Sequence, residues 1–150
     1  MTNTVKLHRV LATKPAKVYR AFLDGAAMAR WLPPDGFTGT MHASDPRVGG
    51  RYRMSFQNFT TGKSQAFGGE YLELVPDQRL RYTDRFEDPA LASATIEVTV
   101  ELKAVPFGTE LSIVQSGLPD AIPVDACYLG WQQSLANLAR LVEPDIPDDM

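Results

Sequence analysis

The strongest constraint on the fold is a stripe of apolar side chains at helical spacing near the end of the chain. It begins after Pro123 and consists of Val124, Tyr128, Trp131, Leu135, Leu138 and Val142. This spacing predicts a helix of about five turns with one apolar face. Asp125 lies in its first turn, where an acidic residue is favourable, and Pro144 follows its end. One long helix of this kind needs an apolar surface to cover, so the rest of the chain must supply it.

The middle of the chain alternates apolar and polar residues with the period of two that is typical of strands. Residues 95–102 are the clearest case, because every second side chain is a large aliphatic one. The other candidate strands are residues 4–13, 38–45, 49–56, 65–74, 79–86 and 109–116. Gly68-Gly69 predicts a bulge or bend within one of them. The alternation predicts one curved antiparallel sheet with a dry face and a wet face.

Two short helices are expected between the first two strands. Residues 14–24 carry Pro15 in the first helical turn, and residues 26–32 end at Pro33-Pro34. The order of elements therefore predicts an α+β fold in which the sheet wraps around the C-terminal helix. At 150 residues, the chain suits a single domain over residues 1–150, with its core at about 5–142 and an acidic tail behind it.

Composition excludes several classes of protein. With 44% hydrophobic and 22% charged residues, the chain has the composition of a globular protein. A net charge of −3 and the lack of a Lys/Arg cluster argue against nucleic acid as a partner. No apolar run approaches the ~20 residues of a membrane span. The lone Cys127 and the absence of a signal-peptide pattern predict a cytoplasmic protein.

Five segments occur in the order seen in one known superfamily. They are LATKPAKVYRAFLDGAAMARWLPPDGF, DPRVGGRYRM, GGEYLELVPDQRLRYTDRF, GTELSIVQSGL and GWQQSLANLARL. In this order the chain resembles the polyketide cyclase/START-like (SRPBCC) superfamily, and in particular the branch named after the activator of the heat-shock-protein-90 ATPase. The resemblance covers roughly residues 5 to 142. It implies a helix-grip fold, in which an antiparallel sheet curls around a C-terminal helix, and a cavity for a hydrophobic ligand.

The resemblance also carries over particular positions. They are Trp31, the turn Arg47-Val48-Gly49-Gly50, Glu73, Pro76 and Gly130-Trp131. The family often has a second aromatic residue where Leu32 stands and a histidine near Gln115. Family roles at those two positions are therefore not transferred to this chain.

A ligand cavity between sheet and helix would have apolar walls and a few polar groups. The expected walls are Trp31, Phe37, Met41, Tyr52, Met54, Phe56, Tyr82, Phe86, Val98, Trp131 and Leu135. Tyr82, Asp84 and Gln115 would orient the ligand, because they share strand faces with apolar residues. Two alternatives stay open: Trp31 either packs in the core or lines the cavity mouth, and Asp84 either lines the cavity or is solvated at a strand end.

No motif assigns a catalytic residue. The two histidines, His8 and His42, are far apart, and no HxxxH, CxxC or Gly-x-Ser-x-Gly pattern occurs. We therefore expect no metal site and no cofactor. The leading hypothesis is binding of a small hydrophobic molecule. The alternatives are a cyclase- or hydrolase-like enzyme that uses Asp84 with Tyr82 on an aromatic or polyketide-like substrate, and a chaperone-activating interaction protein. The sequence leaves a homodimer open.

Overall fold

The computed structural model describes residues 2–149 and contains one sheet and three helices. The helices are α1 (Pro15–Leu23), α2 (Gly25–Trp31) and α3 (Val124–Val142). The strands are β1 (Thr2–Leu11), β2 (Phe37–Ser44), β3 (Arg51–Asn58), β4 (Ser64–Val75), β5 (Arg79–Phe86), β6 (Ile96–Val105) and β7 (Gly108–Pro119). These bounds confirm each expected helix and strand to within a few residues.

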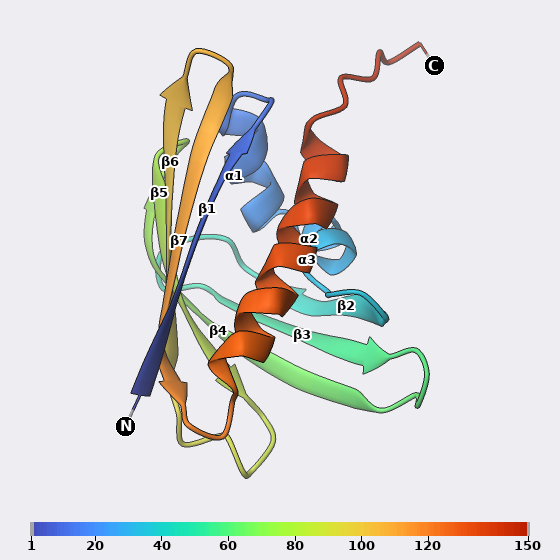
Figure 1. Ribbon diagram of the computed structural model, residues 1–150, viewed down its shortest axis with the longest axis vertical. Coiled ribbons are helices and arrows are strands. Elements are labelled where there is room, and N and C mark those ends of the chain that lie inside the picture. The colour runs from blue at the N-terminus through green and yellow to red at the C-terminus, as the bar shows by residue number, and fades with distance from the viewer. Residues whose placement is uncertain (1, 150) are drawn as a thin grey trace.

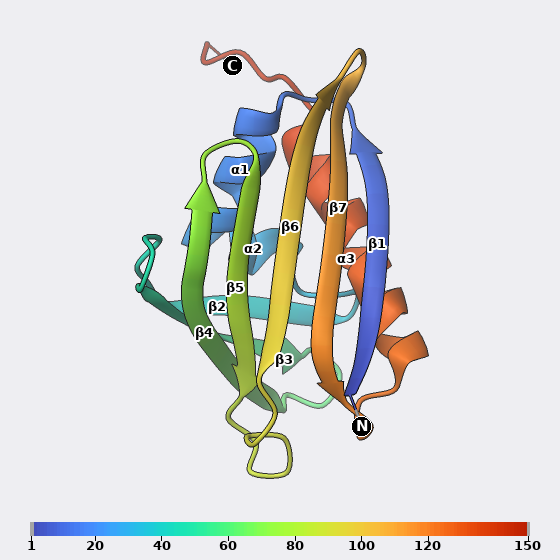
Figure 2. The same cartoon turned by 90° about the vertical axis from the view of Figure 1, so that its left-hand side faces the viewer.

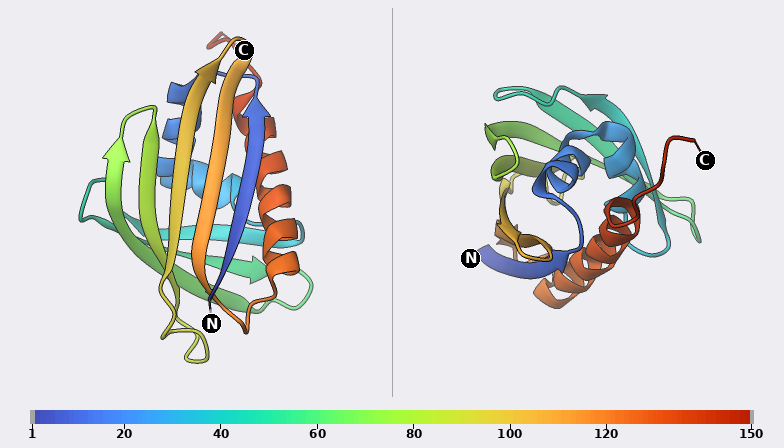
Figure 3. Two further views of the ribbon diagram at one scale, coloured as in Figure 1. Left: turned by 60° about the vertical axis from the view of Figure 1, so that its left-hand side comes forward. Right: turned by 90° about the horizontal axis from the view of Figure 1, so that it is seen from above.

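The seven strands form a single antiparallel sheet in the order β1-β7-β6-β5-β4-β3-β2. In Figure 2, β1, β7, β6 and β5 lie side by side, whereas β2 and β3 cross behind them. The sheet therefore curls, and its concave side encloses α3 together with α1 and α2 (Figure 3). This architecture is the α+β fold expected from the order of elements, and it is the helix-grip fold that the family resemblance implies.

Two glycines of β4, Gly68 and Gly69, allow neighbouring strands to approach closely in the middle of the sheet. A Cβ on Gly68 would collide with the carbonyl of Tyr52, and one on Gly69 would collide with that of Thr83. The pairing of β4 with β5 lapses at Gly69 and Glu70, between the pairs Gly68–Arg85 and Tyr71–Tyr82, and the register shifts only further along, between Tyr71 and Glu73. The expected bulge or bend at Gly68-Gly69 is thus a local break in the β4–β5 ladder without a register shift, and both glycines permit close approach of the neighbouring backbones.

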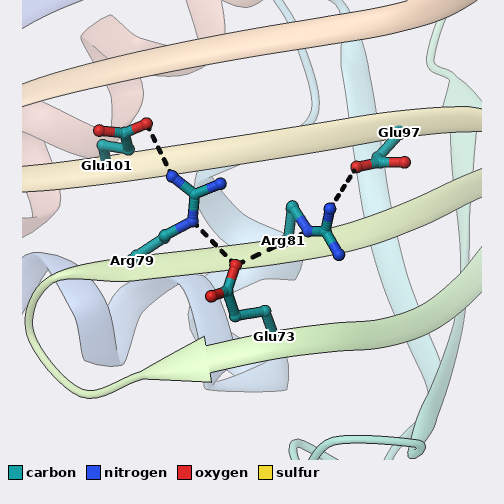
Figure 4. A network of polar contacts seen from close by, with 5 residues as sticks. All are labelled: Glu73, Arg79, Arg81, Glu97 and Glu101. Carbon is teal, nitrogen blue, oxygen red and sulfur yellow. Dashed lines mark hydrogen bonds and ion pairs between the residues drawn. The ribbon is translucent and has the colours of Figure 1, made fainter.

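The outer face of the sheet is polar and carries a chain of ion pairs (Figure 4). Arg79 contacts Glu73 at 2.8 Å and Glu101 at 2.9 Å, so it links β4, β5 and β6. Arg81 lies beside them and contacts Glu97 at 3.2 Å. The alternate residues of the same strands, such as Leu80 and Val100, are fully buried on the inner side. The sheet thus has the wet and dry faces that the alternation predicts.

Helix α3 lies across the concave face of the sheet (Figure 1). Its buried residues are Trp131, Ser134, Leu135, Leu138, Ala139 and Val142. Tyr128, which the apolar stripe includes, is instead 43% exposed. At that level of the helix, Cys127 and Gly130 face the interior, so Tyr128 points outward. None of the helices among residues 2–149 combines the length and apolarity needed to span a membrane.

Candidate ligand cavity

A cavity of about 330 Å³ lies between the sheet, the end of α2 and the N-terminal half of α3. The lining side of the sheet consists of Tyr52, Phe56, Phe67, Tyr82, Asp84, Phe86 and Gln115. The helical side consists of Met28, Leu32, Pro34, Ile122, Ala126, Cys127, Gly130, Trp131 and Ser134. The wall is thus mostly apolar and includes a small number of polar groups, which is the usual composition of a small-molecule site.

Aromatic rings form most of the sheet-side wall. The Tyr52 and Tyr82 rings meet edge to face at 5.9 Å, and Phe67 packs on Phe56 at 4.8 Å and on Phe86 at 6.1 Å. The three phenylalanines also border a second hollow of about 790 Å³. Exposed polar residues of the β3–β4 hairpin bound that larger hollow. The smaller cavity is the better candidate site, because its lining is more strongly apolar than that of the larger hollow.

Strand register places two of the polar groups on one row across the inner face. Tyr82 pairs with Val98, and Val98 pairs with Gln115 on the next strand. Neighbouring strands are about 4.8 Å apart, so Tyr82 and Gln115 are roughly 10 Å apart across the row. Asp84 follows Tyr82 by two residues and shares its face of β5. A ligand in the cavity could therefore reach all three side chains.

Gln115 connects the sheet to α3. Its side-chain oxygen accepts hydrogen bonds from the Trp131 indole nitrogen at 2.8 Å and from the Cys127 sulfur at 3.0 Å. Because an indole N–H can only donate, the amide oxygen must face α3. The amide nitrogen then points away from these partners, and Gln115 is only 6% exposed. Gln115 therefore places an amide N–H group at the wall of the cavity, away from α3.

Asp84 is a partly buried carboxyl group in an apolar wall. Burial raises its pKa to about 7, although hydrogen bonds from the Tyr52 hydroxyl and the Arg85 backbone act in the opposite direction. The Tyr52 hydroxyl lies 3.3 Å from the Asp84 carboxylate. Burial, followed by the charge of Asp84, holds the pKa values of Tyr52 and Tyr82 well above their usual range. Asp84 can thus gain or lose a proton near neutrality while both tyrosines stay protonated.

Cys127 is a thiol rather than a thiolate in this setting. Burial raises its pKa, and the nearby charge of Asp84 raises it further. Its hydrogen bond to the Gln115 oxygen also requires the protonated form. A nucleophilic role has no support here, because nucleophilic cysteines depend on a lowered pKa.

The structure brings seven of the predicted site residues to the cavity wall. They are Tyr52, Phe56, Tyr82, Asp84, Phe86, Gln115 and Trp131. Of the two alternatives for Asp84, the structure selects the cavity wall over a solvated strand end. The other six predicted residues do not line the cavity; they are Trp31, Phe37, Met41, Met54, Val98 and Leu135.

Trp31 belongs to the core and not to the cavity mouth. Its ring is fully buried, packs edge to face on Phe22 at 4.8 Å, and donates its N–H to the Ala21 carbonyl at 2.9 Å. Since α2 folds back on α1, the indole points toward α1. The rigid segment after it contributes Leu32 and Pro34 to the cavity instead.

The remaining five residues fill space or lie at the edge of the sheet. Met54, Val98 and Leu135 are buried in the core. Phe37 is 39% exposed on β2, and Met41 lies beneath the start of α2, where it approaches Gly25. Alternation predicts which side chains face inward, but it cannot distinguish those that meet a cavity from those that meet α1 or α3.

Several lining residues were missed from the sequence. They are Met28, Leu32, Pro34, Phe67, Ile122, Ala126, Cys127, Gly130 and Ser134. Gly130 gave a usable signal, because glycine in mid-helix costs stability and therefore calls for a local reason. A Cβ built on Gly130 would meet no other atom of the described protein within 4 Å, apart from its own helical neighbours. The residue leaves open space in the cavity.

Similar proteins support the fold and identify the family. Residues 12–143 match the family described as Activator of Hsp90 ATPase homolog 1-like protein. Protein CV1439 from Chromobacterium violaceum is 57% identical, with a TM-score of 0.93 over 95% of this chain and 99% of that one. Protein MLL2253 from Mesorhizobium loti is 27% identical, with a TM-score of 0.76 over 96% of this chain and 100% of that one.

A more distant similarity concerns the fold alone. The AHSA1-like protein from Aeromonas hydrophila is 22% identical, with a TM-score of 0.74 over 94% of this chain and 92% of that one. Among proteins with curated descriptions, none matches the chain. With the match over residues 12–143 and the helix-grip architecture together, the chain belongs to the Activator of Hsp90 ATPase homolog 1-like family, in the SRPBCC/START-like superfamily.

Proposed function

We propose that this protein binds a small, largely apolar molecule in the cavity between the curved sheet and α3. One observation carries the proposal: a cavity of about 330 Å³ has mostly apolar walls and includes Tyr82, Asp84 and Gln115. A cavity of this size is at the lower end of the range for ligand sites.

Two features of α3 keep the cavity from being filled by side chains. Gly130 lies in the interior of α3, where an alanine would stabilise the helix by about 1 kcal/mol. The Trp131–Gln115 hydrogen bond holds a polar pair at the wall instead of an apolar contact. A core selected only for stability would have a larger residue at position 130.

Native mass spectrometry of the purified protein, combined with NMR of its tryptophan indoles, tests the proposal. The chain has two tryptophans, and only Trp131 lines the cavity. We expect apolar compounds to shift the Trp131 indole signal while Trp31, bonded to Ala21, serves as an internal reference. A broad library that yields neither a bound mass nor a Trp131 shift would contradict ligand binding.

Acid–base catalysis on the bound molecule is the second candidate, and the position of Asp84 favours it. A carboxyl group whose pKa is about 7 can both accept and donate protons at neutral pH. Catalysis would require Asp84→Asn to retain binding and lose turnover of the compounds that bind. Equal turnover by the variant would remove this candidate, which corresponds to the cyclase- or hydrolase-like alternative.

The family description also supports a chaperone-activating role as a further alternative. Its test is independent of the cavity: the ATPase rate of an Hsp90 chaperone is measured with and without the protein. A rate that does not change would remove that role and leave ligand binding untouched.

A further inference from the structure

The cavity contains one acidic side chain and no basic one. Asp84 is the sole carboxyl group among the described lining residues, and no lysine, arginine or histidine is among them. The other polar groups in the wall, such as Gln115, Tyr82 and Ser134, are neutral. A ligand with a carboxylate or phosphate would meet the negative charge of Asp84 without a compensating cation.

Within residues 2–149, no cationic side chain pairs with Asp84. Its hydrogen-bond donors are the Tyr52 hydroxyl at 3.3 Å and the backbone N–H of Arg85. The Arg85 side chain is exposed and donates to Thr95, while Arg53 pairs with Glu87. Because desolvation of an unpaired carboxylate is costly, a proton or a bound cation would stabilise Asp84 when a ligand displaces water from the cavity.

The aromatic side chains in the wall favour a bound cation beside Asp84 when a ligand is present. Six aromatic residues line the cavity, namely Tyr52, Phe56, Phe67, Tyr82, Phe86 and Trp131. The faces of such rings attract ammonium groups electrostatically, most strongly where water is excluded. A carboxylate beside aromatic rings provides both attractions at one site.

We infer that the cavity selects organic cations, that is, small apolar molecules that carry a protonated amine positioned at Asp84. The inference rests on the proposed ligand-binding function and specifies its ligand class. The apolar body would contact the phenylalanines and Trp131, and the ammonium group would lie between Asp84 and the neighbouring tyrosine rings. The available N–H of Gln115 would accommodate a neutral acceptor elsewhere on the ligand.

Binding of a cation should be linked to release of a proton from Asp84. The titratable groups that interact with Asp84 are Tyr52 on β3, Tyr82 on β5 and Cys127 on α3; Tyr71 on β4 packs behind the two tyrosines, and β6 contributes the uncharged Ile96. Burial raises the pKa of each of these four groups, so none of them ionises near neutrality. Asp84 is then the group that changes charge, and cation affinity should rise from about pH 5 to about pH 8.

Three probes with one apolar body test the inference: 1-naphthylmethylamine, 1-naphthylmethanol and 1-naphthoate, which are cationic, neutral and anionic. Calorimetric titration should give the amine at least about tenfold tighter binding than the alcohol at pH 8, and the carboxylate the weakest binding. Addition of the amine should shift the NMR signal of the Trp131 indole N–H. Equal or tighter binding of the alcohol or the carboxylate would overturn the inference.

Asp84→Asn supplies the matched variant, because it removes the charge and keeps the size. We expect the variant to bind the amine about tenfold more weakly, to bind the alcohol within about threefold of wild type, and to lose the pH dependence. Unchanged amine affinity would contradict a role for Asp84. If the alcohol binds and the amine shows no advantage, cation selection fails and ligand binding stands; if the amine does not bind while other compounds of the library shift the Trp131 signal, cation selection fails in the same way.

Discussion

On the inner face of the sheet, Asp84 and Gln115 interrupt rows of apolar side chains. Gln115 has its oxygen satisfied by Trp131 and Cys127, and it therefore stabilises the contact between sheet and helix. Asp84 has no such compensation, because its donors are one tyrosine hydroxyl and one backbone N–H. Removal of the Asp84 charge should therefore raise the free energy of unfolding, whereas removal of the Gln115 amide should lower it.

Asp84→Asn should raise the free energy of unfolding at neutral and alkaline pH. Because the folded state raises the pKa of Asp84 from 3.8 to about 7, its carboxyl binds more protons folded than unfolded between these values. Wild-type stability should therefore fall as pH rises through this window, and the variant should lack that fall. The expected gain above about pH 7 is on the order of 2 kcal/mol by urea denaturation.

The exposed Asp148 provides the control for this measurement. Asp148→Asn should leave both the stability and its pH dependence close to wild type. A wild-type protein whose stability does not change between about pH 5 and about pH 8 would show that Asp84 is solvated in the folded state.

Gln115→Leu should lower the free energy of unfolding by about 1–3 kcal/mol, because it leaves the buried Trp131 N–H without an acceptor. A double-mutant cycle with Trp131→Phe isolates this effect, since the phenylalanine has no N–H to satisfy. The double variant should be more stable than the sum of the two single changes predicts. Strict additivity in denaturant melts would contradict the hydrogen bond.

The sequence predicted inward orientation at these positions more reliably than it predicted contacts. Tyr82, Asp84 and Gln115 face inward as alternation requires, and all three reach the cavity. Trp31 and Val98 also face inward, but they meet other side chains. What a buried residue meets depends on the relative placement of α1, α2 and α3, and a pattern within one element does not contain that information.

Among the elements, α3 determines both the core and the cavity. Its C-terminal half packs into the core through Leu138 and Val142, whereas its N-terminal half presents Cys127, Gly130 and Trp131 to the cavity. The apolar stripe predicted the helix and its bounds, but it placed Tyr128 inside. A uniform helical repeat cannot show that the partner surface changes from packed side chains to open space along the helix.

Leu138→Ala should destabilise the protein by about 2–4 kcal/mol, because Leu138 is fully buried in the C-terminal half of α3. Leu129→Ala is the matched control on the same helix, since Leu129 is 55% exposed. Its effect should stay within about 0.5 kcal/mol. Chemical denaturation of both variants measures the difference, and equal losses would contradict the packing of α3 on the sheet.

At the scale of the whole molecule, the curved sheet and α3 leave a partly open cavity of about 330 Å³ between them. The order of strands and helices was sufficient to predict the wrapping, because one amphipathic helix and one dry sheet face have to cover each other. The size of the remaining cavity was not predictable, since it results from small differences in side-chain volume at many positions. A side chain added at Gly130 would occupy part of the cavity, because a Cβ there meets no other atom of residues 2–149 within 4 Å apart from its own helical neighbours.

Gly130→Leu is therefore the most direct test of the central claim that an apolar ligand occupies this cavity. The open space at position 130 should accept the side chain, and replacing a mid-helix glycine should maintain or increase stability, by up to about 1 kcal/mol. Calorimetric titration with 1-naphthylmethanol should show binding to wild type and at least about tenfold weaker binding to the folded variant. Equal affinity for the two proteins would contradict the account, because the ligand would then lie outside the cavity.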